Sequence, residues 1–356
     1  MAKIHVVGAG PAGSIAAISA CRSGHDVIVS EEHAVSGLPE NCSGLFSKDG
    51  LESLSGFMDY KRFVIRQMRG ADIYLAGEKL AIRRDEAVGF VCDRAAIDQE
   101  LAARAEAEGA AVNFGERVTD SFRSDNIIGA DGPLSSVARH FRFPKIARYA
   151  ATLQATVPYR AAEPDIVEVF LSQSMFPGFF GWVIPHDEYC AELGVGVAMG
   201  QDLQEAWRGL LRRKGVPAAL VKPRGASIPI SVRRKTGIRA GRKNILLAGD
   251  AAGQVKATTG GGVIFGGNCA ALAGKLATDP ERYEREWRSR FGLDLSIHSA
   301  LRTYLAGLGD AQLASLGRRL KKLNLDGYLS GHGHMDRPTR MIKPGLFKHI
   351  FRNIIA

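Results

Sequence analysis

The pattern of hydrophobic and polar positions predicts a strand, a helix and a second strand at the start of the chain. Residues 4–7 form a short apolar run rich in β-branched side chains, which is typical of a buried parallel strand. A helical pattern follows at 11–23, and residues 27–29 form the next strand. This order of elements indicates the beginning of an α/β sheet.

A second pattern, in which polar and apolar residues alternate, begins near residue 151. Alternation with a period of two predicts strands that have one covered face. A helix at 203–214 interrupts these strands, and short strands at 68–92 are expected as a hairpin or meander outside the first sheet. The strands expected beyond residue 150 are 151–157, 166–171, 181–184, 191–198 and 227–232.

These patterns predict an α/β fold with a discontinuous first domain. Residues 1–60, 88–148 and 233–278 are expected to form a Rossmann-like dinucleotide-binding domain. Residues 61–87 and 149–232 are expected to form an inserted β-sheet domain that holds the substrate. Apolar residues at helical spacing predict a C-terminal helical region at 279–356.

Glycines follow the first strand in the G-x-G-x-x-G spacing of dinucleotide-binding turns. Gly8 permits a tight turn, Gly10 lets the backbone approach a pyrophosphate, and Gly13 lets the helix pack on the strand. Glu31 ends the second strand, where it can accept hydrogen bonds from a ribose, which favours FAD or NAD over NADP. The alternative is a glycine-rich turn in a protein that binds no nucleotide.

Two more turns that pair an acid with glycine follow predicted strands. They are Asp131–Gly132 and Gly249–Asp250. Asp250 is a candidate acceptor for ribityl hydroxyls, and the helix that follows the glycines at 260–262 offers amides to an anionic flavin ring. Taken alone, each turn is also compatible with a purely structural role.

Cys42 and Arg94 are candidate functional residues near the expected cofactor edge. Cys42 lies in a proline- and glycine-rich loop, where a free cysteine is either a buried filler or a functional thiol. Ser47 stands where flavin disulfide reductases have a second cysteine, which argues against a dithiol relay. Arg94 begins a helix capped by Asp93 and is either a solvated arginine or a contact to cofactor phosphates.

The densest aromatic stretch of the chain, M-F-P-G-F-F-G-W-V-I-P, covers residues 175–185. Single aromatic residues usually belong to a core. Four aromatic residues separated by prolines and glycines instead favour an apolar pocket. The stretch therefore predicts the surface that binds the substrate.

Composition and charge narrow the classes of partner. The 356 residues carry a net charge of +10, which favours a phosphorylated substrate or an anionic membrane surface. No nucleic-acid partner is expected, because no aromatic-interleaved binding motif is present. The basic and apolar tail at 346–355 predicts either packing on the body of the protein or contact with a membrane surface.

Cysteine usage favours a reducing compartment, so the protein is expected in the cytoplasm. The five cysteines are scattered and form no C-x-x-C pair, which argues against a zinc site. His332 and His334 have no acidic or thiol partner nearby in the sequence, so no metal is expected.

Three separated segments together resemble the FAD-binding fingerprints of the flavoprotein hydroxylase fold, which is of the glutathione reductase type. They are G-A-G-P-A-G with Glu31, I-G-A-D-G at 128–132 and A-G-D-A-A-G at 248–253. The chain further resembles the geranylgeranyl reductase family, and most of all its archaeal members, which saturate the isoprenoid chains of membrane lipids. The segments similar to that family are P-E-N-C-S-G-L at 39–45, D-R-A-A-I-D at 93–98, G-D-A-A-G-Q-V-K-A-T-T-G-G-G-V at 249–263 and G-H-M-D-R-P at 333–338.

This resemblance implies FAD as the cofactor and a defined set of binding residues. The implied cofactor contacts are Gly8, Gly10, Ala12, Gly13, Glu31, Glu32, Cys42, Gly44, Arg94, Asp131, Gly132, Gly249, Asp250, Gly253, Gly260, Gly261, Gly262 and Val263. The family signature P-x-x-Y-x-W-x-F-P maps onto the implied substrate contacts Pro177, Phe180, Trp182, Ile184 and Pro185. Phe180 replaces the signature tyrosine and Ile184 the phenylalanine, so the pocket loses a hydroxyl and some ring area.

The resemblance also implies the reaction, which is saturation of isoprenoid double bonds by hydride transfer from N5 of a reduced flavin. An isolated alkene has no carbonyl to take up charge, so positioning and water exclusion would provide most of the acceleration. Cys42 is the candidate for proton delivery or for gating. Arg233 and its basic neighbours are expected either to meet a lipid phosphate or to form a solvated face.

Two questions stay open at this point. The chain has no second G-x-G-x-x-G turn, so the electron donor is external and is a ferredoxin, a deazaflavin or a nicotinamide. The alternative functions are a flavin-dependent monooxygenase of the same fold and a prenyl-lipid-binding flavoprotein without enzymatic activity.

Overall fold

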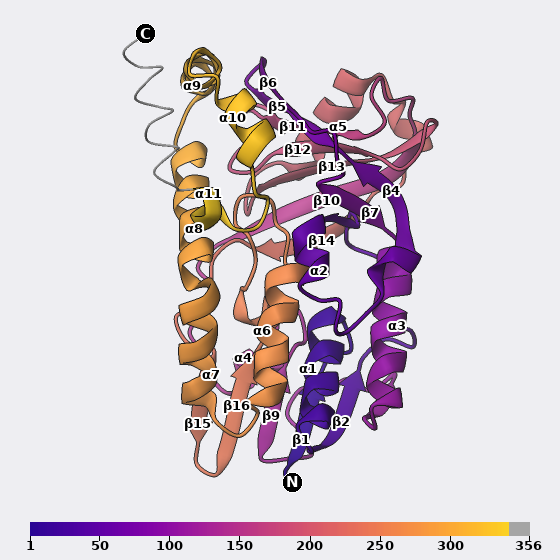
Figure 1. The fold of residues 1–356 in the computed structure, drawn as a ribbon, viewed down its shortest axis with the longest axis vertical. Coiled ribbons are helices and arrows are strands. Elements are labelled where there is room, and N and C mark those ends of the chain that lie inside the picture. Colours follow the sequence, from indigo (N-terminus) through magenta and orange to yellow (C-terminus); the bar gives the residue numbers. More distant parts are fainter. Residues whose placement is uncertain (342–356) are drawn as a thin grey trace.

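Two large sheets lie one above the other in the computed structural model, which describes residues 1–341 (Figure 1). The lower sheet contains the N-terminal strand, and helices stand alongside it. The upper sheet crosses the opposite end of the molecule, where the helices α9 and α10 (Asp310–Lys322 and Leu325–His332) also lie. The expectation for the tail at 346–355 falls outside the described residues.

The lower sheet has six strands in the order β15-β16-β9-β1-β2-β8. All neighbours are parallel except β15 and β16. The strand order reverses direction at β1, and open α/β sheets bind ligands beyond the carboxyl ends of the strands at such a point. The strands are β1 (Lys3–Val7), β2 (Asp26–Glu31), β8 (Ala111–Phe114), β9 (Asn126–Gly129), β15 (Gly237–Ala240) and β16 (Lys243–Leu247).

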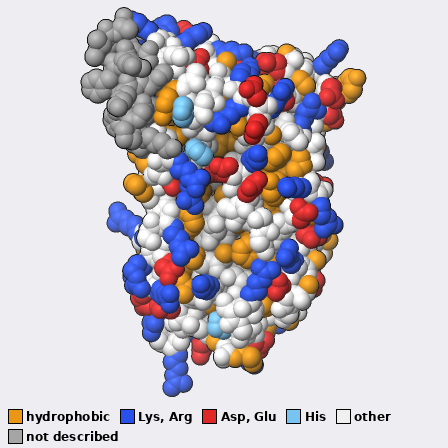
Figure 2. Space-filling model, viewed as in Figure 1, with side chains coloured by type: hydrophobic (Ala, Val, Ile, Leu, Met, Phe, Trp, Pro, Cys, Tyr) orange, Lys and Arg blue, Asp and Glu red, His pale blue; other side chains and the backbone are white. Residues whose placement is uncertain are grey.

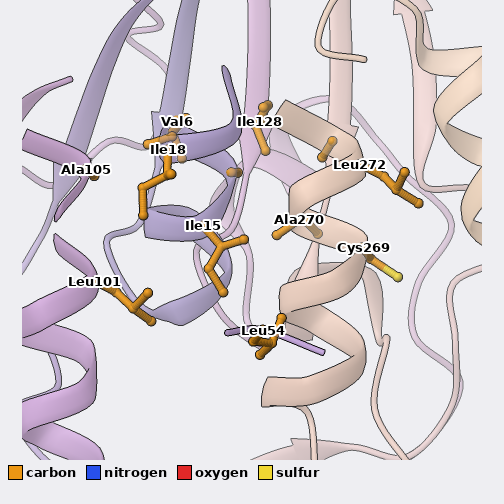
Figure 3. Close-up of a cluster of buried hydrophobic side chains, with 14 of the residues drawn as sticks. Val6, Ile15, Ile18, Leu54, Leu101, Ala105, Ile128, Cys269, Ala270 and Leu272 are labelled. Atoms are coloured by element: carbon orange, nitrogen blue, oxygen red, sulfur yellow. The ribbon is translucent and has the colours of Figure 1, made fainter. Parts of the chain in front are cut away.

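Three helices cover one face of the lower sheet. They are α1 (Pro11–Arg22), α3 (Arg94–Ala107) and α6 (Val263–Lys275). Ile15 and Ile18 of α1 belong to one buried cluster with Leu101 of α3, and Ile15 points toward α6 (Figure 3). A side chain at Gly274 would meet the carbonyl of Ala16 at 2.2 Å, so α1 and α6 pack backbone to backbone. The short helix α4 (Ser136–His140) packs on the other face.

The upper sheet has seven strands in the order β14-β10-β13-β12-β11-β5-β6. One face packs against α5 (Leu203–Lys214) through the buried Trp207 and Leu210. The helix begins at its cap Asp202 and ends at Gly215 in the left-handed conformation, as the residue types favour. The strands are β5 (Gly70–Leu75), β6 (Glu78–Arg83), β10 (Tyr149–Pro158), β11 (Ile166–Leu171), β12 (Gly181–Pro185), β13 (Cys190–Ala198) and β14 (Arg224–Pro229).

A small antiparallel sheet and the C-terminal helices complete the described chain. The small sheet has the order β3-β7-β4, with strands at Leu45–Ser47, Gly89–Cys92 and Val64–Met68, and α2 (Lys48–Glu52) follows β3. Helices α7 (Pro280–Trp287) and α8 (Leu293–Ala306) continue each other through a π-helical turn at Arg288–Gly292. α9 packs on the upper sheet through the buried Leu313, and α11 (Pro338–Met341) follows α10.

The expected strand at 227–232 is wrong by about half its length, because β14 occupies Arg224–Pro229. The pairing with β10 ends at Pro229. Beyond it, Ser231 leaves the sheet and its hydroxyl accepts hydrogen bonds from the amides of Ala147 and Arg148. The domain boundaries stay a prediction. No helix within residues 1–341 has the length and apolar character needed to cross a bilayer.

Candidate functional site

A cavity of about 1210 Å³ lies between the carboxyl edge of the lower sheet and one face of the upper sheet. Small-molecule sites are typically about 300–1,000 Å³, so this cavity has room for more than one ligand. Residues that follow β1, β2, β9 and β16 form its lower wall, and β10, β11, β12 and β14 contribute its upper wall. The strand-end motifs and the aromatic stretch, far apart in the sequence, therefore meet at one space.

The first glycine turn has the geometry that the spacing predicts. Gly8 has a φ of +99°, and a side chain there would meet the carbonyl of Ala130 at 2.5 Å. A side chain at Gly13 would lie 1.8 Å from the carbonyl of Gly8, so the helix touches the turn directly. A side chain at Gly10 would meet nothing within 4 Å, and Gly10 borders the cavity. The open side of the turn thus faces the space where a pyrophosphate would lie.

Glu31 faces the cavity from the end of β2 and also holds the glycine turn. Its Oε2 accepts a hydrogen bond from the amide of Ala9 at 2.7 Å. Its Oε1 accepts from the amide of His33 at 3.0 Å and lies 2.7 Å from the His33 ring. Glu32 also borders the cavity and lies 3.3 Å from Arg117. The carboxylate of Glu31 is therefore oriented before any ribose contact.

In the second turn, the carboxylate of Asp131 mainly accepts hydrogen bonds at the N-terminus of α4. Its Oδ2 accepts from the amide of Ser136 at 2.6 Å and the amide of Val137 at 3.1 Å, and its Oδ1 accepts from the hydroxyl of Ser135 at 2.6 Å. The neighbouring Gly132, with a φ of +75°, has open space where a side chain would be. Both residues border the cavity, and Gly132 leaves room for a ligand there.

The third turn brings Gly249, Asp250 and the glycines 260–262 to the same wall. Burial raises the pKa of Asp250 to about 6. A side chain at Gly262 would lie 2.6 Å from the Asp250 carboxylate, so only glycine fits between that acid and α6. Ala12, Gly260, Gly261 and Val263 also border the cavity. This wall therefore offers a half-buried acid beside the N-terminal amides of α6.

Cys42 lies on the cavity wall beside Arg94. Burial raises the pKa of the Cys42 thiol, and the adjacent Arg94 guanidinium opposes this only in part. Arg94 makes a two-point ion pair with Asp98 at 2.7 and 2.9 Å. Arg94 thus borders the cavity as expected, but its guanidinium faces Asp98 and Cys42. The thiol is protonated at neutral pH and can act as a proton donor.

The aromatic stretch divides between the cavity and the core of the upper sheet. Phe180, Trp182 and Ile184 alternate along β12 and its approach and face the cavity, together with Phe179. The Phe179 and Phe180 rings stack with centroids 4.4 Å apart, and Phe180 lies 5.5 Å from Trp182. Phe176 is instead fully buried with the residues that face α5. The predicted apolar pocket is therefore formed by part of the stretch.

Five of the predicted contacts do not border the cavity. Gly13, Gly44 and Gly253 are needed for close backbone approach, since side chains there would meet the carbonyls of Gly8, Cys92 and Ser231 at 1.8, 2.2 and 2.3 Å. Pro185 ends β12 and Pro177 precedes it; the carbonyl of Pro177 accepts from the amide of Ala198. The role of these five residues as ligand contacts stays a prediction.

The expectation that Arg233 meets a lipid phosphate or belongs to a solvated face is also wrong. Arg233 is buried, and its guanidinium donates to the carbonyls of Ala251 and Pro144 at 2.6 Å each. It ties the loop after β14 to the turn that contains Asp250. A run of Lys and Arg residues predicts exposed side chains. The burial of Arg233 could not be predicted, because its partners are two backbone carbonyls that no sequence pattern indicates.

Four residues at the cavity or behind its wall were missed. Lys256 and Asp336 form a buried ion pair of 2.5 Å beside Gly261, and Ser47 donates to the same carboxylate. Although burial opposes it, Lys256 holds the pKa of Asp336 below its ordinary value. Gln154 and Glu192 are buried polar residues of the upper sheet. The segment G-H-M-D-R-P contains Asp336, and the alternating residues 190–198 contain Glu192. These patterns do not indicate which residues the two acids contact.

The fold is that of the FAD-dependent flavoprotein oxidoreductases, as the three turns predict. The structure is similar to a geranylgeranyl bacteriochlorophyll reductase-like protein from Thermoplasma acidophilum, with a TM-score of 0.78 and 21% identity over 100% of this chain and 96% of that one. It is also similar to a probable FAD-dependent monooxygenase from Pseudomonas aeruginosa, with a TM-score of 0.64 and 19% identity over 89% and 99% of the two chains.

The names of related proteins indicate an activity more closely than the fold does. The chain is 28% identical to the digeranylgeranylglycerophospholipid reductase of Methanothrix thermoacetophila, over 91% of this chain and 94% of that protein. It is also 28% identical to the enzyme of the same name from Methanosarcina mazei, over 90% and 89%. No family model matches. The resemblance to geranylgeranyl reductases that the motifs indicated is thereby confirmed.

Proposed function

We propose that this protein is an FAD-dependent reductase that saturates carbon–carbon double bonds in the geranylgeranyl chains of membrane phospholipids. The observation that carries the proposal is the single cavity that joins the glycine turn, a protonated thiol and an apolar wall. Its size suits a cofactor together with a lipid chain. The names of the relatives support both the cofactor and the lipid class.

The chain's residues fit FAD along the lower wall. The open space at Gly10 and Gly132 would admit the phosphates and the adenosine half, with Glu31 at a ribose. Asp250 would accept from the ribityl chain, and the amides that begin α6 would face the flavin ring. When bound and reduced, FAD supplies a hydride equivalent at N5.

The residues of the upper wall would hold the isoprenoid chain and exclude water from it. Phe180, Trp182 and Ile184 present rings and an aliphatic side chain to the cavity. A chain without polar groups gains affinity from burial there at roughly 25 cal/mol per Å². Holding the double bond against the cofactor edge converts the reaction to an effectively intramolecular one, which is the main source of rate for an unactivated alkene.

Cys42 would donate the proton that completes saturation. Its thiol lies on the cavity wall and stays protonated because burial raises its pKa. The thiolate left after donation would be stabilised by the neighbouring Arg94. We expect Cys42→Ser to retain bound FAD and to lose most of the alkene reduction.

The function is tested under anaerobic conditions with the purified holoprotein. After reduction with dithionite, addition of a geranylgeranyl phospholipid should reoxidise the flavin, and the lipid should gain one pair of hydrogens for each double bond lost. Cys21→Ser, at a half-buried cysteine of α1, is the control for the Cys42 variant. Oxygen consumption in proportion to product would instead support a monooxygenase, and unchanged turnover in Cys42→Ser would remove the thiol from the mechanism.

We also propose that the electrons come from an external donor and that the protein meets an anionic membrane surface. The described residues contain a single sheet with a dinucleotide-type glycine turn, so a nicotinamide, a deazaflavin or a ferredoxin would have to dock transiently. The net charge of +10 supports the membrane contact. Lys and Arg side chains are spread over the face in Figure 2 with Asp and Glu between them. Binding to anionic vesicles that weakens with salt would support it, and equal binding to neutral vesicles would contradict it.

A further inference from the structure

A buried carboxyl group lies behind the aromatic wall of the cavity. Glu192 belongs to β13 and is 2% exposed. Its Oε1 accepts a hydrogen bond from Nε1 of Trp182 at 3.2 Å, across the β12–β13 pair. It makes no ion pair within 4 Å among the described residues. A carboxyl that is buried without a close cation is a neutral acid at the pH where most carboxylates are charged.

The strand register places Glu192 on the face of the upper sheet that faces the cavity. Glu192, Gly194 and Gly196 alternate along β13 opposite Ile184, Trp182 and Phe180. A side chain at Gly194 would lie 2.1 Å from the Trp182 ring, so the indole lies flat over that glycine. This packing fixes the indole, and the indole in turn fixes the orientation of the carboxyl group.

Two charged groups act on Glu192. Arg224 on β14 lowers its pKa, and Glu40, in the loop after β2, raises it. Burial has the largest effect and raises the pKa of Glu192 to about 7, although the Trp182 hydrogen bond and Arg224 both lower it. On β10 the facing groups, Gln154 and Thr156, are uncharged. Trp182 on β12 is the hydrogen-bond donor.

Glu192 is also electrostatically coupled to Cys42. Its charge raises the pKa of the Cys42 thiol, so loss of a proton from one group makes loss from the other harder. On β10, opposite Gly194, Nε2 of Gln154 is buried without a hydrogen-bond partner although its side chain borders the cavity. A buried donor of this kind is normally satisfied by a ligand or an ordered water.

The two charged groups that act on Glu192 are themselves partly exposed to solvent. Arg224 and Glu40 lie 3.9 Å apart with side chains that are 40% and 32% exposed. The charges of Arg224 and Glu40 thus act on Glu192 from a polar edge, whereas Glu192 itself is buried. The side chains of the upper wall around Trp182 are otherwise mainly apolar and aromatic.

We propose that Glu192 is the proton reserve of the site and returns a proton to Cys42 after each reduction, through a water held at Gln154. This inference rests on the proposed function. In one cycle the thiol S–H bond breaks as the proton bonds to the substrate carbon, while the reduced flavin supplies the hydride and is oxidised. The Glu192 O–H bond then breaks, the thiol re-forms, and the carboxylate takes a proton from solvent at the Glu40 edge.

The first test reads the carboxyl group directly in the resting holoprotein. Infrared spectra recorded against pH should show a protonated carboxyl band that disappears with a midpoint near 7 and is absent from Glu192→Gln. The exposed Glu188, in the same hairpin and 3.0 Å from Arg66, provides the control variant Glu188→Gln, which should keep the band. If no band is lost in Glu192→Gln, the assignment of a neutral acid is overturned.

The second test separates one reduction from repeated reductions. In Glu192→Gln the first double bond should be reduced at the rate of the unmodified protein, because Cys42 carries its own proton. Later reductions should slow by about 100-fold, the scale of a lost acid–base group. In the unmodified protein the later rates should fall as pH rises through the transition seen by infrared. Glu188→Gln should show neither effect.

The outcomes are distinguishable from failure of the proposed function. Equal slowing of the first and later reductions in Glu192→Gln would overturn the proton reserve and leave only a role in positioning Trp182. Unchanged rates throughout would overturn both roles. If the unmodified protein reduces no lipid, the proposed function fails with the relay, whereas the infrared titration still decides whether Glu192 is a buried acid.

Discussion

The two walls of the cavity are built in different ways. The lower wall consists of backbone turns at the ends of parallel strands, where Gly8, Gly132 and Gly249 adopt positive φ values. The upper wall consists of side chains that alternate along one face of a mainly antiparallel sheet, with Trp182 and Gln154 among them. The lower wall therefore depends on where side chains are missing, and the upper wall on which side chains are present.

This contrast explains why the two walls tolerate sequence change differently. A turn that needs close backbone contact accepts only glycine, so its pattern stays visible at low identity. A side-chain wall can exchange one apolar residue for another of similar volume at modest cost. The replacements at Phe180 and Ile184 relative to the family signature are of this second kind.

The largest expected effect is a difference in stability between alanine variants of two glycines in the same turn, Gly13 and Gly10. Gly13→Ala puts a methyl group where the Gly8 carbonyl is only 1.8 Å away, so the turn or the helix must move. We expect a loss of at least about 3 kcal/mol and little folded flavoprotein. Gly10→Ala meets nothing within 4 Å and should keep its stability, while FAD binds about tenfold more weakly.

These two variants are compared by thermal unfolding and by the amount of flavin released on dilution. The pair sharpens the contrast because both changes add the same methyl group within one motif. A Gly10→Ala protein that binds FAD normally would show that the cofactor does not approach the open side of the turn.

The second expected effect separates two phenylalanines of the aromatic stretch. Phe176 is fully buried against α5, so Phe176→Ala should cost about 3–5 kcal/mol of stability and leave flavin chemistry intact in the molecules that fold. Phe180 borders the cavity, so Phe180→Ala should cost less stability and should weaken lipid binding. Chemical denaturation and the lipid dependence of flavin reoxidation measure the two quantities. If Phe176→Ala and Phe180→Ala changed stability and lipid binding equally, the assignment of Phe176 to the core and Phe180 to the pocket would be contradicted.

The smallest expected effect concerns pH and Asp250. The pKa of this acid is raised to about 6 by burial, so the group is neutral below that pH and a carboxylate above it. A carboxylate accepts hydrogen bonds only, so FAD affinity of the unloaded protein should rise as pH passes upward through 6. Asp250→Asn should remove this dependence. An affinity that falls with rising pH, or a dependence retained in Asp250→Asn, would argue against contact with the ribityl chain.

The sequence predicted where the turns of the lower wall lie, because each turn is local. Each motif contains its strand, its turn and the start of its helix within a few residues, so Gly8, Asp131 and Asp250 could be placed without knowing the tertiary structure. Outside the first turn, the motifs could not show which glycines touch backbone and which face open space. Gly44 and Gly253 belong to the first group because Cys92 and Ser231, distant in the sequence, pack against them.

The upper wall could be predicted only in part. The period-two pattern identified the sheet, and the aromatic stretch identified its apolar side. The register between strands, which brings Glu192 beside Trp182 and Gln154 beside Arg224, is set by long-range pairing. The same limit hid Asp336, whose partner Lys256 lies 80 residues earlier in the chain.

The central claim is that a reduced flavin in this cavity transfers hydrogen to an unactivated double bond. Its most direct test is the anaerobic reaction of the dithionite-reduced holoprotein with a geranylgeranyl phospholipid in D₂O, followed by flavin absorbance and by mass spectrometry of the lipid. The account predicts reoxidation of the flavin and incorporation of two deuterons for each double bond lost. A flavin that stays reduced while the lipid keeps its mass would contradict it.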